Sequence, residues 1–299
     1  MPTLLPVRPH PASDEAMDSY LERLATANGV TTGFFSRQLV AEAQAPLRFT
    51  NIAPPPPVLE VLASWTGIDG SRLRLCLLTR YSIIPAIDSR SRHATRAVVA
   101  HGWVLLNRSQ ACPWCLAETG IWKSTWRLNW VTACLIHECL LVTDCPGCQK
   151  PLRSTHHGEL RPAGPGALCG NARSRGQGKR CRFDLSRIPP LSAPPPVLQQ
   201  QRRVEQALRD TAVDLGGVPL PGTTYLKLLQ TLTAGSLGQP TPPPPSPLRT
   251  TSPDTFDPPC LLGPVRPSPR NVQARAAACV RSDQKILAFH QKSGRLPLD

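Results

Sequence analysis

Two groups of cysteine and histidine residues have the spacing of metal ligands. In the first group, Cys112-Pro-Trp-Cys115 is followed after 18 residues by Cys134-Leu-Ile-His137. A Cys-x-x-Cys turn directs two thiolates at one ion, and a second pair that folds back supplies the other two ligands of a tetrahedron. A closed set of four ligands leaves no open position for hydrolytic chemistry. We therefore expect Cys112, Cys115, Cys134 and His137 to hold one structural zinc ion.

A second set of cysteines follows directly. Cys145-Pro-Gly-Cys148 is a compact turn, and 20 residues separate Cys148 from Cys169. A further 11 residues separate Cys169 from Cys181, so this half is looser than a Cys-x-x-Cys pair and contains a basic, glycine-rich insertion over residues 170–180. These four cysteines predict a second structural zinc site, and each site would lie in its own zinc ribbon.

The sequence leaves other uses of these residues open. At the second site, His156 or His157 could replace one of the cysteines. A thioredoxin-like redox pair is an alternative for a Cys-x-x-Cys motif, but it requires a strand-then-helix context and a single pair. Disulfides are a still less favoured interpretation, because they rarely persist in a chain that looks intracellular. Four other cysteines lack ligand spacing, and we interpret the first two as small buried hydrophobic residues: Cys76, Cys139, Cys260 and Cys279.

Tryptophans are concentrated between the two ligand pairs of the first group. Trp122, Trp126 and Trp130 are three of the six tryptophans in the chain. We expect them to form the core of the first zinc module, which has little other apolar material. Stacking on the bases of single-stranded nucleic acid is the alternative.

Helical patterns precede these motifs. Residues 12–29 predict a helix with Ser13 as its N-cap and Gly29 at its end, because five apolar residues form one stripe: Met17, Tyr20, Leu21, Leu24 and Ala25. After a proline spacer at 54–57, residues 58–65, a turn at 66–69 and a second amphipathic stretch predict a helix-turn-helix-like unit. An ordinary helical hairpin with solvated arginines is the alternative.

The C-terminal third predicts helices separated by proline. Residues 197–210, 223–232 and 274–290 have helical patterns, whereas residues 239–270 are too rich in Pro, Ser and Thr to form a packed core. The predicted fold class is therefore mainly α with small zinc-ribbon modules. The predicted regions are 1–108 (helical, with the helix-turn-helix-like unit), 109–143 (first zinc ribbon), 144–188 (second zinc ribbon), 189–238 (helical), 239–270 (Pro-rich linker) and 271–299 (C-terminal helix).

The charge of the chain favours an anionic partner. The 299 residues carry a formal net charge of +14, and nucleic acid is the leading anionic partner for such a chain. Basic residues concentrate in stretches 72–96 and 153–187, which predict salt-sensitive affinity for phosphates. The alternative is a solvated face or a contact with protein. The predicted nucleic-acid contacts are Arg72, Arg74, Arg80, Arg173, Arg175, Lys179 and Arg180.

The sequence shows neither a membrane span nor a catalytic motif. It has no run of about 18 apolar residues and no signal-peptide layout at its start, so we expect a cytoplasmic protein that does not insert into a membrane. It also has no Walker loop, no Gly-x-Ser-x-Gly elbow, no His-Glu-x-x-His motif and no carboxylate cluster of the kind that nuclease metals need. We therefore expect a protein that is not an enzyme.

Three landmarks of the sequence resemble the TniQ family, whose relatives include TnsD-type target selectors. The first is the opening Leu5-Pro-Val-Arg-Pro-His-Pro11 with Glu15 and Ser19-Tyr-Leu-Glu-Arg-Leu-Ala25. The second is Cys112-Pro-Trp-Cys-Leu-Ala-Glu118, continued through the tryptophans to His137. The third is Leu140-Leu141 with Cys145-Pro-Gly-Cys148 and Pro151-Leu152. The resemblance covers roughly residues 4–185, and the chain departs from it in the basic insertion and in the Pro-rich tail.

The resemblance implies a non-catalytic adaptor in transposition. Members of the family connect target-site recognition to an AAA+ ATPase of the TnsC/TniB type, which recruits the transposase. Some members bind DNA directly and others join an RNA-guided effector complex; a homodimer is a further assembly to test. The resemblance also implies that the eight Cys and His residues of the two groups are zinc ligands. The alternative function is a transcriptional regulator that binds DNA through a zinc ribbon or helix-turn-helix, and a zinc hydrolase ranks third.

Overall fold

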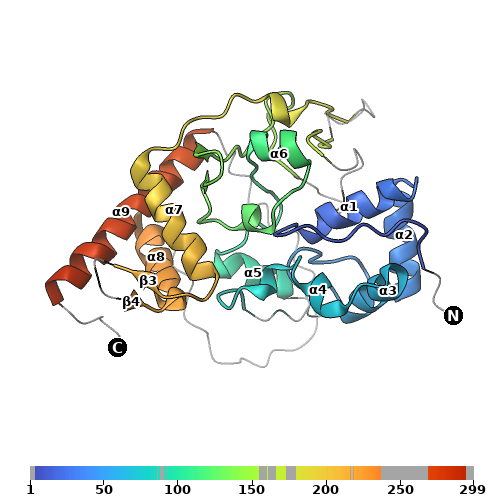
Figure 1. Ribbon diagram of the computed structural model, residues 1–299, viewed down its shortest axis with the longest axis horizontal. Helices are drawn as coiled ribbons and strands as arrows, with labels where there is room; N and C mark the ends of the chain where they lie inside the picture. Colours follow the sequence, from blue (N-terminus) through green and yellow to red (C-terminus); the bar gives the residue numbers. More distant parts are fainter. Residues whose placement is uncertain are drawn as a thin grey trace, which may run out of the picture.

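The chain is mainly helical, as predicted, and its strands are very short. The computed structural model describes residues 4–85, 87, 91, 93–154, 160, 166–172, 180–215, 217, 219–236 and 269–293. Within these ranges there are nine α-helices and two pairs of two-residue strands. Figure 1 shows the first four helices at one end of the molecule and the last three at the other. The irregular chain that carries the cysteine motifs lies between these two groups.

The N-terminal end is built from four helices with a shared apolar core. They are α1 (Met17–Ala27), α2 (Thr32–Ala43), α3 (Pro56–Thr66) and α4 (Gly70–Arg74). Helix α2 has no counterpart among the predicted helices, because its fully buried apolar face is narrow. Thr31 begins this helix by accepting a hydrogen bond from the Phe34 amide, and Phe35 and Leu39 are buried against its neighbours.

The predicted start of the first helix is wrong. Helix α1 begins at Met17 after Ala16, which makes no side-chain cap, so Ser13 is not the N-cap. The amide of Ala16 instead donates to the carbonyl of Trp122 (2.8 Å), and the amide of Ser124 donates to the carbonyl of Asp14 (2.7 Å). These long-range hydrogen bonds hold the residues before α1 in a non-helical conformation.

Helices α3 and α4 meet at the predicted turn. Gly67 ends α3 with φ of 69°, and the Asp69 side chain accepts from the Ser71 amide to begin α4. Helix α4 is only five residues long and is followed by a 3-10 turn, η1 (Leu78–Arg80). The second helix is therefore shorter than the amphipathic pattern indicates, and a DNA-reading helix-turn-helix stays a prediction.

Three longer helices pack together at the C-terminal end. They are α7 (Pro195–Leu208), α8 (Gly222–Ser236) and α9 (Pro269–Ser293), and they match the three helices expected in this part of the chain. A hairpin of β3 (Val213–Asp214) and β4 (Pro219–Leu220) connects α7 to α8. The buried Asp283 of α9 accepts hydrogen bonds from Tyr225 of α8 and Arg203 of α7, which ties all three helices together. Residues 239–268 of the predicted linker lie outside the described ranges.

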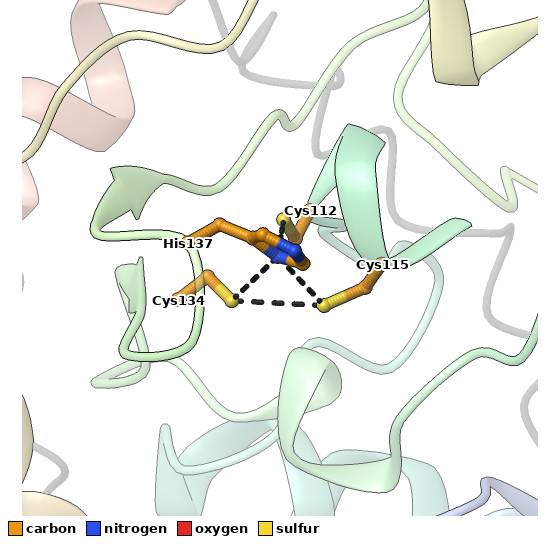
Figure 2. Close-up of side chains that lie close together, drawn as sticks. All are labelled: Cys112, Cys115, Cys134 and His137. Carbon is orange, nitrogen blue, oxygen red and sulfur yellow. Dashed lines mark hydrogen bonds between the residues drawn. The ribbon is translucent and has the colours of Figure 1, made fainter. Parts of the chain in front are cut away.

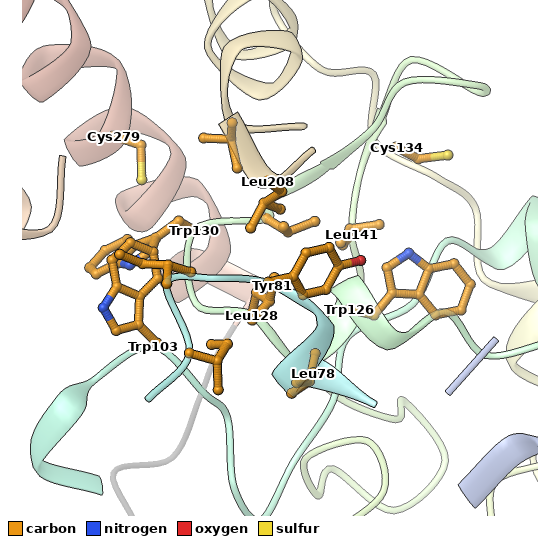
Figure 3. Packing of buried hydrophobic residues seen from close by; sticks show 14 of the residues in the cluster. Leu78, Tyr81, Trp103, Trp126, Leu128, Trp130, Cys134, Leu141, Leu208 and Cys279 are labelled. Atoms are coloured by element: carbon orange, nitrogen blue, oxygen red, sulfur yellow. The ribbon is translucent and has the colours of Figure 1, made fainter. Parts of the chain in front are cut away.

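The largest core cluster joins the middle of the chain to the C-terminal helices. Trp122, Trp126 and Trp130 are almost completely buried, which confirms their predicted place in the core. Figure 3 shows Trp130 beside Trp103, at 6.2 Å between ring centroids, with Leu208 of α7 and Cys279 of α9 in the same cluster. The tryptophans thus pack within a core that extends well beyond one zinc module. The exact region boundaries stay predictions.

Two further helices flank this core. Helix α5 (Ala94–His101) precedes the tryptophan segment, and α6 (Pro113–Thr119) carries part of the first cysteine motif. Helix α5 is another element that the sequence pattern does not predict. Among the described helices, none combines the length and the apolar character that a membrane crossing requires.

Candidate metal centres

The first ligand group is positioned by a helix start and a hairpin. Cys112 is the N-cap of α6, Pro113 occupies the first turn, and Cys115 therefore lies one turn into the helix. Cys134 ends β1 (Ala133–Cys134), which pairs with β2 (Cys139–Leu140), and His137 lies in the turn between these strands. Figure 2 shows the three sulfur atoms and the imidazole converging on one point.

The distances within this group fit one tetrahedral ion. His137 Nδ1 lies 3.4 Å from the Cys112 Sγ and 3.3 Å from the Cys115 Sγ, and the Sγ atoms of Cys115 and Cys134 are 3.6 Å apart. Zinc–ligand bonds of about 2.3 Å to sulfur and about 2.0–2.1 Å to nitrogen imply tetrahedral edges of about 3.6–3.8 Å. The thiols are too far apart for disulfides, whose sulfur atoms are about 2.05 Å apart. The four residues can hold one metal ion.

The imidazole of His137 is oriented by its surroundings. Its Nε2 is 2.9 Å from the Glu118 Oε1, and the Trp114 ring packs edge-on against it at 5.5 Å between centroids. A hydrogen bond from Nε2 to a carboxylate leaves Nδ1 as the unprotonated nitrogen and makes it a better metal donor. The pair therefore prepares Nδ1 for coordination before any ion binds.

A fourth thiol touches this group and was not expected there. The Sγ of Cys139 lies 3.6 Å from the Cys112 Sγ, and Cys139 is almost completely buried. Cys139 faces Cys134 across the hairpin, so strand pairing brings it to the ligands although its sequence spacing does not. Hydrogen bonds from the neighbouring thiols lower the pKa of Cys112, and Cys115 contributes most, followed by Cys134 and Cys139. The lower pKa favours the thiolate that a metal requires.

The second group consists of four cysteines from two separate turns. Cys145 and Cys148 lie in a turn closed by the bridge between Asp144 and Pro151. The Sγ of Cys181 is 3.7 Å from that of Cys145, and the Sγ atoms of Cys148 and Cys169 are 3.8 Å apart.

These distances also fit a tetrahedral zinc site in which all four ligands would be cysteine sulfur atoms. A hydrogen bond from the Cys169 thiol lowers the pKa of Cys145 to about 5. Burial raises this pKa, but by less than the hydrogen bond lowers it. His156 and His157, the alternative ligands, lie outside the described residues.

Neighbouring side chains support the second turn. The Asn171 amide nitrogen donates to the Pro151 carbonyl at 2.8 Å and approaches the Cys148 Sγ at 3.6 Å. Phe183 covers Gly147 so closely that a Cβ at this position would lie 2.7 Å from the Phe183 Cβ. Only glycine fits here without displacement of the ring.

A buried ionic network connects α1 to the chain around both metal groups. Asp18 accepts from Arg127 of η2 (Ser124–Arg127) at 2.7 Å and from Arg153 at 2.5 Å. Arg153 also bonds Glu22, and its guanidinium stacks over the Trp122 ring at 4.3 Å. Burial alone would raise the pKa of Asp18, but the charges of Arg153 and Arg127, together with hydrogen bonds from Arg127 and Asn51, lower it to about 2. One helix is thus held by residues from the first and the second metal modules.

The predicted nucleic-acid contacts have different surroundings. Arg72 and Arg74 are exposed on α4, and Arg180 is exposed beside the second metal group. Arg80 is half-buried, where it bonds the Leu75 carbonyl and forms a pair with Asp14. The guanidinium of Arg80 is therefore already bound within the chain, and its contact with DNA is the least supported of these predictions. The remaining predicted contacts lie outside the described residues: Arg173, Arg175 and Lys179.

Comparison with known proteins assigns a family to the N-terminal part. Residues 6–141 match the family model described as TniQ. The match covers α1 and the whole first metal group and ends just before the second group begins. A search of curated proteins finds no match.

Proposed function

Because residues 6–141 match the TniQ family model, we propose that this chain is a non-catalytic, zinc-dependent adaptor in DNA transposition. The family implies a transposition-related role. In the proposal, the chain connects recognition of the target site to the transposon AAA+ ATPase, which brings the transposase. DNA, that ATPase and, in the RNA-guided variant of the pathway, an effector complex are its proposed partners.

One observation carries this proposal. The opening helix of the family match, α1, is joined to the metal modules by buried ion pairs from Asp18 to Arg127 and to Arg153. Arg153 follows the second metal turn and lies beyond the matched segment, so the family region and the second group are held together. A rigid platform with several surfaces suits a protein that holds partners at fixed positions.

Zinc is the ion that the donor sets favour. Three thiolates with one imidazole, and four thiolates, are sets that structural zinc takes in tetrahedral geometry. Each group offers four protein side chains that could complete a tetrahedron around one ion. Zinc bound there would stabilise the fold, and a closed first shell is consistent with a protein that does no chemistry at the metal.

Direct DNA binding is part of the proposal and rests on charge. Arg72 and Arg74 extend from α4 on the surface, in a chain with a formal net charge of +14. Contacts of this kind neutralise phosphates and release counterions, so affinity should fall steeply as salt rises. An affinity for duplex DNA that does not change between 50 and 200 mM salt (a range of the usual order) would contradict direct binding.

The adaptor role is tested by capture of the ATPase. Purified wild-type chain should contain two zinc ions by native mass spectrometry and should retain the ATPase encoded with it in a pull-down. The control is Arg187→Met, which changes a largely exposed side chain that is not one of the proposed metal ligands. DNA binding without any ATPase binding would instead favour the transcriptional regulator. Absence of zinc would overturn the metal-dependent adaptor altogether.

A further inference from the structure

A hollow of about 220 Å³ lies where three parts of the chain meet. Its lining comes from the N-terminal region (Asp14, Arg80 and Tyr81), from residues between 123 and 136 of the first metal module, and from the end of α7. We call this space the junction hollow. It would hold about seven water molecules at about 30 Å³ each, so it suits a small ligand or the end of a peptide rather than a folded segment.

Apolar side chains make up much of the lining of the junction hollow. Figure 3 shows three of them, Tyr81, Trp126 and Leu208, which are all buried. Ile136 also lines the hollow and is 67% exposed, so part of the apolar lining can be reached from solvent. Ligand pockets are typically concave and mostly apolar, with a few polar groups that fix the orientation of the ligand.

One of the cations that line the junction hollow has no partner. Asp14 pairs with Arg80, and Glu205 lies 3.8 Å from the Arg209 guanidinium. By contrast, no hydrogen bond or ion pair joins the half-buried Lys123 ammonium to another of the described residues. A lysine ammonium has three N–H donors, and a partly buried charge is costly unless it is paired. Lys123 is therefore the group in this hollow that lacks an acceptor.

The surrounding charges decide which acceptor fits. Burial raises the pKa of Glu205, and the charges of Arg209 and then of Lys123 act against this increase, so Lys123 lies near Glu205 without bonding to it. The carboxylates of Asp14 and Glu205 also line the hollow. They repel a dianionic phosphate more strongly than a singly charged carboxylate, because the repulsion scales with the charge. A ligand carboxylate is therefore the anion that Lys123 can accept at the lowest cost.

We propose that the junction hollow binds a ligand that carries one carboxylate on a small apolar body. Lys123 holds the carboxylate, and Trp126, Leu208 and Ile136 contact the apolar body. A free organic acid and the C-terminus of a peptide both present this chemistry, and the test below distinguishes them. Because the lining comes from three parts of the chain, the bound ligand connects them and stabilises the folded state. This binding site does not depend on the proposed adaptor function.

Paired probes isolate the carboxylate. Isocaproate and isocaproamide share one aliphatic body, N-acetyl-leucine and N-acetyl-leucinamide repeat the comparison for a peptide end, and inorganic phosphate is the fifth probe. Titration calorimetry and the thermal midpoint of the zinc-loaded wild-type chain measure binding. We expect at least one acid to bind and to raise the midpoint, with its amide and phosphate at least about tenfold weaker, as for loss of a hydrogen bond to a charged group. Binding of isocaproate identifies a free acid as sufficient, and binding of N-acetyl-leucine alone identifies a peptide end.

Variants of Lys123 test its role directly. Lys123→Met should weaken binding of the acid at least about tenfold, whereas Lys123→Arg keeps the charge and should retain binding. The control is Lys227→Met, at an exposed position of α8, a helix that contributes no described residue to the hollow. All three variants should keep the zinc content of the wild type. Equal affinity of the wild-type chain for an acid and its amide, no binding of either acid, or wild-type affinity in Lys123→Met would overturn the proposed site.

Discussion

At the residue scale, the contacts distinguish the proposed metal ligands from the residues that only surround them. His137 directs Nδ1 at three sulfur atoms and is held by Glu118, whereas Cys139 contacts only Cys112 among the thiols of this group. Cys112, Cys115, Cys134 and His137 could hold one metal ion without Cys139. Cys139 therefore supports the site from outside the ligand set, and this assignment can be checked by substitution.

Substitution of Cys112 and of Cys139 should have different effects on zinc content. Cys112→Ser removes a ligand, so we expect loss of the first zinc ion and insoluble or unfolded protein, since metal binding and folding are coupled. Cys139→Ala should keep two zinc ions per chain, with a loss of stability of about 1 kcal/mol for the lost buried sulfur atom and its contacts. Native mass spectrometry gives the stoichiometry. A Cys139→Ala protein with only one zinc ion would make Cys139 a ligand.

Gly147 provides a steric test of the second group. A Cβ at this position would lie 2.7 Å from the Phe183 Cβ, so Gly147→Ala should shift the turn that carries Cys145 and Cys148. We expect a loss of about 1–3 kcal/mol, as for other overpacked sites, and faster transfer of one zinc ion to a chelator. Gly33→Ala is the control, because a Cβ there would lie 3.7 Å from the Arg37 side chain and alanine favours a helix. Equal thermal midpoints and zinc transfer rates in the two variants would contradict this packing argument.

At the element scale, α1 is the helix on which the metal modules converge. Its apolar stripe, with Tyr20 and Leu24, packs among the N-terminal helices. Its polar face holds Arg127 and Arg153 through Asp18, and Glu15, just before the helix, binds Arg23. A helix with a buried apolar stripe and a buried ionic face cannot be moved without disturbing its partners on both sides.

Removal of one partner from the ionic network should be costly. Arg153→Met leaves two buried carboxylates with fewer partners, so we expect a loss of about 3–5 kcal/mol in the free energy of unfolding. Arg187→Met is the control, because that arginine is mostly exposed and its pair with Asp184 should contribute at most about 1 kcal/mol. Chemical denaturation measures both variants.

The pH dependence of the network follows from the same charges. The folded-state pKa of Asp18, about 2, is below the ordinary value of 3.8, so its stabilisation is complete above pH 3.8 and is lost as the pH falls toward 2. Removal of Arg153 leaves burial of Asp18 less opposed and raises the pKa of Asp18 in the variant, so the destabilisation of Arg153→Met relative to wild type should be largest at neutral pH and should shrink as the pH falls. A destabilisation that grows as the pH falls would mean that another group dominates the network.

At the scale of the whole molecule, the metal groups are part of the main core. The same apolar cluster contains Cys112 and Cys145 and also Leu208 of α7 and Cys279 of α9. Arg275 of α9 is buried and bonds the Gln110 side chain at 2.6 Å, two residues before the first ligand. The C-terminal helices therefore depend on the metal modules although they contribute no ligand.

Zinc removal should consequently unfold more than the metal modules. With a strong chelator in excess, we expect far-ultraviolet circular dichroism to show loss of helix from α7, α8 and α9, together with a lower thermal midpoint. The structural reason is the shared core, and the energetic reason is that an ion bound only by the folded state stabilises it. Readdition of zinc after a brief treatment is the control for irreversible damage. Full retention of the helical signal in zinc-free protein would contradict this dependence.

The sequence by itself determined the local chemistry. Cys-x-x-Cys spacing identified both groups of residues that lie close enough to hold a metal ion, because four residues in a fixed turn place two thiols together in any fold. The apolar stripe of α1 and the patterns of α7, α8 and α9 also predicted helices, since a helix of this length repeats its buried face several times. The tryptophans between the ligand pairs were predicted to be buried for lack of other apolar material, and they are.

Only the tertiary structure decided how distant residues combine. It moved the start of α1 from Ser13 to Met17, because long-range hydrogen bonds to the tryptophan segment outweigh a local cap. It brought Cys139 to Cys112 through strand pairing, and it brought Arg153 to Asp18 across 135 positions of sequence. It also engaged Arg80 with Asp14 within the chain. Such contacts depend on how elements pack in space, and neither residue spacing nor periodicity carries that information.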